Sequence, residues 1–203
     1  MKALQLLIVL GALCCHLTSI AQSSTYVIVH GAWGGTWQFK KTAHLLQDAG
    51  QQVYRPSLTG LGDKYHLAHK DIDLRTHIHD VINSILFEDL KDVVLVGHSY
   101  GGMIITGVAD SIPDRIKKLV YLDAMIPKDG ESVFGALSHG KELSFSSAIK
   151  PEQDFLIPAW VRDTTKTPRD VPHPIKTMTQ QLALKNKKRM QIPTTYVFTY
   201  EST

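Results

Sequence analysis

The stretch that decides the fold is Val93–Gly102, which has the sequence VVLVGHSYGG. Its β-branched, apolar first half predicts a strand that is buried on both faces of a parallel sheet. The Gly-x-Ser-x-Gly pattern that follows predicts a very tight turn into a helix, with Ser99 in a strained conformation above the sheet edge. Gly97 and Gly101 are expected to be glycine because a Cβ at either position would collide where helix and strand nearly touch.

This turn is typical of a nucleophile elbow, so Ser99 is the candidate nucleophile. The N–H of Tyr100, at the start of the helix, is a candidate oxyanion donor because the helix dipole lies behind it. His98 is expected to point off the turn and to pack beside the pocket. A glycine-rich turn with an incidental serine is the alternative, which the flanking strand and helix disfavour.

A second loop of the same kind occurs near the start of the chain. An apolar strand is expected over 25–29, and it runs into the sequence HGAWGG at residues 30–35. Glycines directly after a strand let the backbone turn sharply and expose N–H groups, which suits the other half of an oxyanion hole. The N–H of Ala32 is the candidate donor, and the candidate pocket residues of this loop are His30, Gly31 and Trp33.

Strands and helices are expected to alternate along the chain. The patterns predict strands at 52–55, 118–123 and 194–200, and helices at 37–50, 76–87 and 101–111. This alternation predicts an α/β fold with a mostly parallel, doubly wound sheet, whose ligands bind at the carboxyl ends of the strands. Asp123 lies at such an end. Because periodicity weakens over residues 125–191, this segment is expected to be an inserted cap, with a loosely packed loop region as the alternative.

The first 21 residues differ from the rest of the 203-residue chain. Residues 1–21 combine Lys2, an apolar run and a small-x-small site that ends at Ala21, which predicts a signal peptide and a secreted or periplasmic domain over 22–203. Both cysteines, Cys14 and Cys15, lie in this segment, so a cysteine nucleophile and a thiolate metal site are excluded. A net charge of +3 gives no reason to expect a nucleic-acid partner.

Three motifs occur in order, HGAW at 30–33, LTGLGD at 58–63 and GHSYGG at 97–102. With them the chain resembles the α/β-hydrolase superfamily, and more closely the bacterial carboxylesterases related to plant methyl-ester esterases and hydroxynitrile lyases. The resemblance implies hydrolysis of small carboxylic esters at Ser99 without a cofactor. The spacing of the histidines and aspartates gives no reason to expect a metal site, and residues 1–21 are too short for a stable membrane anchor. The lyases usually carry Thr after the first-strand His, and Gly31 therefore favours the esterases.

The resemblance also implies a general-base histidine after one further strand, and the chain ends before that strand. The fold is therefore expected to be truncated before its last strand and helix, with an impaired triad. His139 and His173 are expected at the surface or lining the cap. Asp123 is favoured over Glu201 as the triad acid, with a turn cap as the other interpretation of Asp123. An inactive ligand-binding protein of the same fold is the alternative function.

Overall fold

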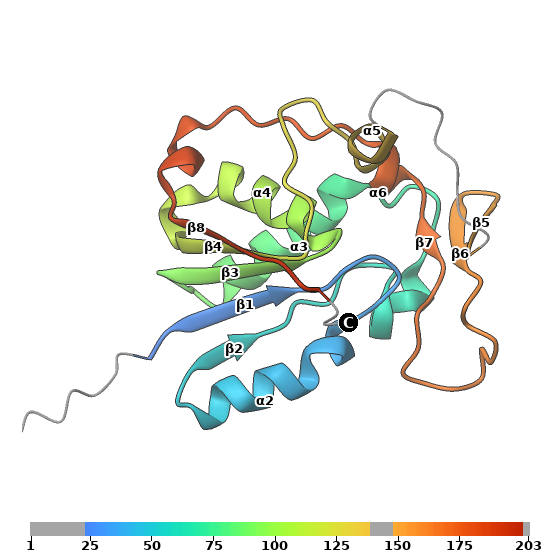
Figure 1. The fold of residues 1–203 in the computed structure, drawn as a ribbon, viewed down its shortest axis with the longest axis horizontal. Helices are drawn as coiled ribbons and strands as arrows, with labels where there is room; N and C mark the ends of the chain where they lie inside the picture. Colours follow the sequence, from blue (N-terminus) through green and yellow to red (C-terminus); the bar gives the residue numbers. More distant parts are fainter. Residues whose placement is uncertain (1–22, 139–147, 201–203) are drawn as a thin grey trace, which may run out of the picture.

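The computed structural model describes residues 23–138 and 148–200. The predicted signal peptide over 1–21, together with His139 and Glu201, lies outside the described residues. A five-stranded, all-parallel sheet forms the centre, in the order β2-β1-β3-β4-β8 (Figure 1). Its strands are β1 (Thr25–Val29), β2 (Gln52–Tyr54), β3 (Val93–His98), β4 (Ile116–Leu122) and β8 (Thr194–Val197).

Helices connect these strands, as the alternating pattern predicted. In the view of Figure 1, α2 lies below the sheet and α4 lies above it. The longer helices are α2 (Lys40–Asp48), α3 (Leu74–Phe87) and α4 (Gly101–Ser111). Short 3-10 helices are η1 (Thr36–Phe39), η2 (Gly62–Leu67), η3 (Pro113–Arg115) and η4 (Lys187–Gln191). The predicted mostly parallel sheet with flanking helices is confirmed.

The centre of the core is the pair β3 and α4. Leu95 of β3 and Met103, Ile104 and Ile105 of α4 are fully buried. Burial of side chains on all sides of α4 explains why its sequence lacks a polar face. The decisive stretch of sequence therefore forms the middle of the molecule, where apolar burial stabilises the fold most.

Element boundaries differ from the expectations at several ends. α3 begins at Leu74 rather than Thr76, because the Asp73 carboxylate accepts the Thr76 N–H at 2.8 Å and the Thr76 hydroxyl accepts the Asp73 N–H at 3.5 Å. This reciprocal capping satisfies free N–H groups of the first turn. The last strand, expected over 194–200, ends at Val197.

The segment over 125–191 contains a second, smaller sheet. Antiparallel strands β5 (Ile149–Glu152), β6 (Phe155–Pro158) and β7 (His173–Pro174) pair in that order, and the short helices are α5 (Val133–Ser138) and α6 (Lys176–Thr179). Figure 1 places this sheet beyond the end of β1 at which the chain enters the loop of residues 30–35. Within residues 23–138 and 148–200, no helix combines the length and the apolarity that crossing a membrane requires.

Candidate active site

Ser99 occupies the tight turn between β3 and α4. Its backbone φ is 52°, in the left-handed region that a non-glycine residue rarely adopts. The strain is held in place from both sides, since the Ser99 N–H donates to the Leu122 carbonyl at 3.3 Å and the Ser99 carbonyl accepts the Met125 N–H at 3.1 Å. Backbone strain that the surrounding structure holds in this way is common at catalytic sites.

Close backbone approaches explain the glycines around Ser99. A Cβ on Gly97 would lie 2.7 Å from the Gly101 carbonyl oxygen, and one on Gly101 would lie 2.7 Å from the Val29 carbonyl oxygen. A Cβ on Gly31 would lie 3.2 Å from the Ser99 Cβ. The loop after β1 therefore lies directly against the turn that carries Ser99.

The two candidate oxyanion donors lie on either side of this contact. Tyr100 is the N-cap residue of α4, and Ala32 belongs to the loop after β1. Neither backbone N–H donates to an acceptor within the described part of the chain. The His30 Nδ1–H donates to the Gly31 carbonyl at 2.9 Å, and because the peptide is planar, this bond orients the Ala32 N–H on the other side of it. Among residues 23–138 and 148–200, both amide protons are therefore without an acceptor beside the contact of Gly31 with Ser99.

The imidazoles of His30 and His98 are held close to the turn. His30 is 1% exposed, and burial lowers its pKa to about 4, so the ring is neutral near pH 7. The His98 ring packs edge-on against Phe39, at 5.7 Å between centroids, as expected for a packing residue. Burial also lowers the pKa of His98, whereas the charge of Asp123 raises it.

Asp123 follows β4, the strand next to β3. Its φ is 45°, its side chain is exposed, and its carboxylate accepts the Thr199 hydroxyl at 2.6 Å. Its N–H donates to the Val197 carbonyl at 2.8 Å. Trp33, Ser99 and Asp123 thus all have positive φ and follow three adjacent strands. Strained backbone therefore follows each of these three strands at the carboxyl edge of the sheet, where ligands bind in this kind of fold.

Three buried polar side chains beside Tyr100 were not predicted as part of the site. They are His77, His173 and Thr177, each 0% exposed. The Tyr100 hydroxyl lies 3.0 Å from His77 Nδ1, and the His77 Nε2–H donates to the Thr59 carbonyl at 2.9 Å. Of the two places expected for His173, the surface is wrong, because the small sheet of the 125–191 segment buries its ring against Trp33 and Tyr100. Nothing in their spacing indicates this cluster, since its members lie far apart in sequence.

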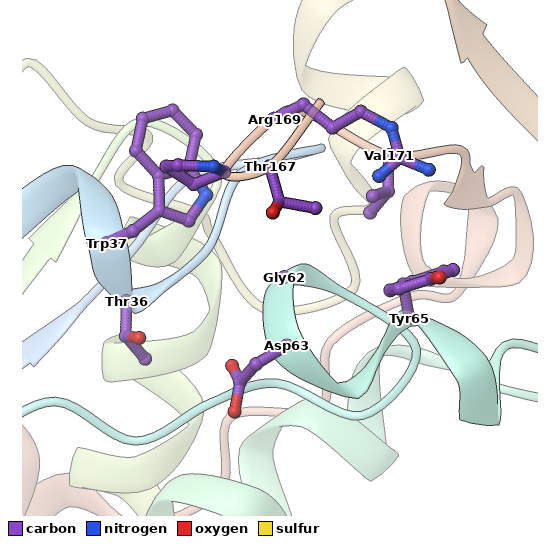
Figure 2. A pocket seen from close by; sticks show the side chains of 9 residues that line it. Thr36, Trp37, Gly62, Asp63, Tyr65, Thr167, Arg169 and Val171 are labelled. Carbon is purple, nitrogen blue, oxygen red and sulfur yellow. The ribbon is translucent and has the colours of Figure 1, made fainter. Parts of the chain in front are cut away.

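A cavity of about 390 Å³ lies between η2 and the segment that leads to β7 (Figure 2). The Arg169 guanidinium stacks over the Tyr65 ring, at 5.2 Å from its centroid. Trp37, on the opposite side of the cavity in Figure 2, precedes α2. Ser99 is not one of the residues that line this space. Among the described residues, no group of three or more His, Cys, Asp or Glu side chains is placed to hold a metal ion.

The strain at Ser99 gives a stability prediction. Ser99→Gly is expected to be more stable than Ser99→Ala by about 1 kcal/mol in the free energy of unfolding, because only glycine adopts positive φ without steric cost. Urea unfolding of both variants measures this difference. The same pair at Ser111, on the last turn of α4, is the control, and there the alanine variant is expected to be the more stable one. Equal stabilities of the two Ser99 variants would show that the turn is unstrained.

Strand order, elbow and strained carboxyl edge together define the class of this protein. The chain belongs to the Alpha/beta hydrolase family, which matches it over residues 26–200. A carbendazim hydrolyzing esterase of Nocardioides sp. (strain SG-4G) is 51% identical over 114 residues, which are 56% of this chain and 47% of that protein.

Plant relatives match the chain less closely. A putative chloroplastic methylesterase (methylesterase 14) of Arabidopsis thaliana is 30% identical over 135 residues, 65% of this chain and 38% of that protein. The alpha-hydroxynitrile lyase of the same plant is 36% identical over 112 residues, 50% of this chain and 40% of that protein. The chain therefore spans less than half of the length of these curated relatives.

One solved structure shares both sequence and fold with the chain. An extracellular α/β-hydrolase from a Paenibacillus species superposes with a TM-score of 0.63 and 28% identity, covering 85% of this chain and 76% of that one. That protein is described as sharing structural and functional homology with tobacco salicylic acid binding protein 2. The resemblance to bacterial esterases and to the plant methylesterase and hydroxynitrile lyase group is thus confirmed.

Proposed function

We propose that this protein is a serine hydrolase of small carboxylic esters, with Ser99 as the nucleophile. The observation that carries the proposal is the positive φ of Ser99, 52°, at a turn packed against the loop that bears Ala32. In a nucleophile elbow this conformation lifts the serine side chain off the strand, and the proposal places its hydroxyl beside the amide protons of Ala32 and Tyr100, which no described residue accepts. The names of the bacterial esterase and the plant methylesterases support the same class of substrate.

In the proposed reaction, Ser99 Oγ attacks the ester carbonyl carbon and loses its proton to a base. The carbonyl oxygen becomes an anion that accepts hydrogen bonds from the N–H groups of Ala32 and Tyr100. Collapse of this tetrahedral intermediate expels the alcohol and leaves an acyl group on Ser99, which water then hydrolyses. Asp123 would hold the imidazole of the base in the right tautomer.

The proposal is tested by covalent labelling. A fluorophosphonate that reacts with activated serines should add once per chain, and proteolysis with mass spectrometry should place the adduct on Ser99. Labelling of a different serine, such as the exposed Ser111, would contradict the assignment. No labelling, together with tight binding of a small ester, would favour the alternative of a catalytically inactive ligand-binding protein.

The general base is the part of the triad that the described residues do not supply. No described histidine is hydrogen-bonded to the Ser99 hydroxyl, whereas His77 and His173 use both ring nitrogens elsewhere. We therefore propose that this 203-residue chain turns over slowly, because a serine hydroxyl without a proton acceptor is a weak nucleophile at neutral pH.

Added imidazole should then restore activity to the chain. With p-nitrophenyl acetate as substrate, millimolar imidazole is expected to raise the Ser99-dependent rate by about 10-fold or more, because it supplies the missing proton acceptor. The rate with Ser99→Ala, which includes the direct reaction of imidazole with the ester, is subtracted. A fast rate that imidazole does not change would mean that a base is already present.

Two further expectations remain proposals. Hydroxynitrile lyase activity is disfavoured by Gly31, and release of cyanide from a cyanohydrin would be needed to revive it. We also propose that the protein is secreted or periplasmic, on the evidence of residues 1–21. Fractionation of cells that express the chain, with amino-terminal sequencing of the exported product, tests this localisation.

A further inference from the structure

Trp33, the residue after Ala32, is joined to the small sheet and its flanking segments by three hydrogen bonds. The Trp33 N–H donates to His173 Nδ1 at 3.2 Å, its indole N–H donates to the Leu156 carbonyl at 2.9 Å, and its carbonyl accepts the Val171 N–H at 2.9 Å. Trp33 itself has a φ of 60°, so these contacts hold a strained residue in place. Small-sheet residues therefore determine where this end of the oxyanion loop lies.

The bond from Trp33 to His173 requires one particular tautomer of the imidazole. The Thr177 hydroxyl donates its proton to the Pro174 carbonyl at 2.8 Å, so Thr177 Oγ1 accepts from the second ring nitrogen of His173, at 2.7 Å. The His173 Nε2 atom therefore carries the proton, and Nδ1 is left as the acceptor that Trp33 needs. Burial keeps the pKa of His173 well below its ordinary value, so the ring stays neutral.

The same imidazole also touches the other side of the oxyanion hole. Its ring lies 5.1 Å from the Tyr100 ring, between centroids, in an edge-to-face arrangement. The Tyr100 hydroxyl donates to His77 Nδ1, because the other nitrogen of His77 is the donor to Thr59. The side chain of one oxyanion residue and the backbone that follows the other thus meet at His173.

We propose that His173 is a positioning residue of the oxyanion hole. Its Nδ1 fixes the N–H of the Ala32–Trp33 peptide, whose carbonyl is held in turn by the Gly34 N–H at 2.7 Å, and its ring edge supports Tyr100. This inference rests on the proposed serine hydrolase function. It assigns to a buried histidine of the small sheet a role in transition-state stabilisation rather than in proton transfer.

The first test does not depend on activity. Amide hydrogen exchange by NMR should show about 10-fold faster exchange of the Trp33 N–H in His173→Leu than in the natural chain, because leucine fills space but accepts no hydrogen bond. His173→Asn places a carbonyl oxygen near the former Nδ1 and should restore the slow exchange. Thr177→Val, which frees the tautomer, should give an intermediate rate, and Thr177→Ser should behave like the natural residue.

The second test separates positioning from folding by steady-state kinetics, with imidazole added where the basal rate requires it. His173→Leu and Thr177→Val should lower kcat by about 10- to 100-fold with KM within about 2-fold, because a displaced donor acts only in the transition state. His173→Asn and Thr177→Ser should recover most of kcat. If His173→Leu does not fold, the Thr177 pair decides.

Each outcome has one meaning. Unchanged Trp33 exchange in both disrupting variants, or a loss that appears in KM with kcat intact, would overturn the role of His173. Failure of the asparagine variant to recover kcat in a folded protein would do the same. Absence of Ser99-dependent hydrolysis in the natural chain with imidazole would instead refute the proposed function, while the exchange measurements would still decide whether His173 holds the loop.

Discussion

Ser99→Ala is expected to abolish covalent acylation and to lower ester hydrolysis by at least about 10³-fold under conditions in which a base is available. The remaining rate should be independent of imidazole beyond its direct reaction with the ester. The reason is that the amide groups of Ala32 and Tyr100 can still polarise the carbonyl, but no hydroxyl is left to form the acyl-enzyme. Stopped-flow measurement of p-nitrophenol release from p-nitrophenyl acetate gives the burst and the steady rate.

The matched control is Ser111→Ala, at the other end of α4, which should leave burst and steady rate unchanged. The free energy of unfolding of both variants should equal that of the natural chain within about 0.5 kcal/mol, so that a kinetic loss is not mistaken for unfolding. A full burst in Ser99→Ala would place the nucleophile elsewhere and would remove the main support of the hydrolase proposal.

Acid should destabilise the fold before its carboxylates titrate. Below pH 6.5 the histidines of the unfolded chain bind protons, whereas the buried histidines of the folded protein stay neutral. The free energy of unfolding therefore falls as the pH is lowered from 6.5 toward about 4, the pKa of His30 in the fold. His30 alone accounts for about 3 kcal/mol of that loss, because its pKa is about 4 in the fold and 6.5 in the unfolded chain. Burial lowers the pKa of His77 and His173 as well, and adds to the loss in the same direction.

Urea unfolding at pH 7, 5.5 and 4.5 measures this effect. In His173→Asn the free energy of unfolding should fall less steeply with pH than in the natural chain, because one buried neutral imidazole has been removed. Substitution of the exposed His44 by Gln should leave the slope unchanged. A free energy of unfolding that stays level between pH 7 and 4.5 would contradict this prediction. It would mean that the rings of His30, His77 and His173 become charged in the fold at little cost.

The sequence was most informative where local pattern and tertiary structure agree. The run from Val93 to Gly102 is apolar because β3 is buried on both faces, and its glycines are explained by backbone contacts that a Cβ would break. The parallel sheet at the core, the elbow and the close approach of the loop after β1 could therefore be predicted, whereas the order of the strands was not. Boundaries were predicted less well, since the start of α3 depends on the side chain of Asp73.

Contacts between distant segments could not be predicted in this way. Trp33 and His173 are 140 positions apart, and no periodicity links them. The described residues of the 125–191 segment, 125–138 and 148–191, form short strands and helices that are stabilised by packing and by single hydrogen bonds. Such contacts leave little trace in the pattern of apolar residues. The roles of Ser99, Ala32, Tyr100 and Asp123 remain predictions that the experiments above decide.

Trp33 is far along the sequence from its hydrogen-bond partners, Leu156 and His173, and this separation affects when the active site forms during synthesis. A ribosome-bound chain exposes the serine long before it exposes the imidazole and the carbonyl that fasten the tryptophan. Contacts between segments this far apart form late, because closing so large a loop costs entropy before any bond is gained. In nascent chains Ser99 should therefore be unreactive, and its reactivity toward acylating agents should appear only when the ribosome has translated the small sheet.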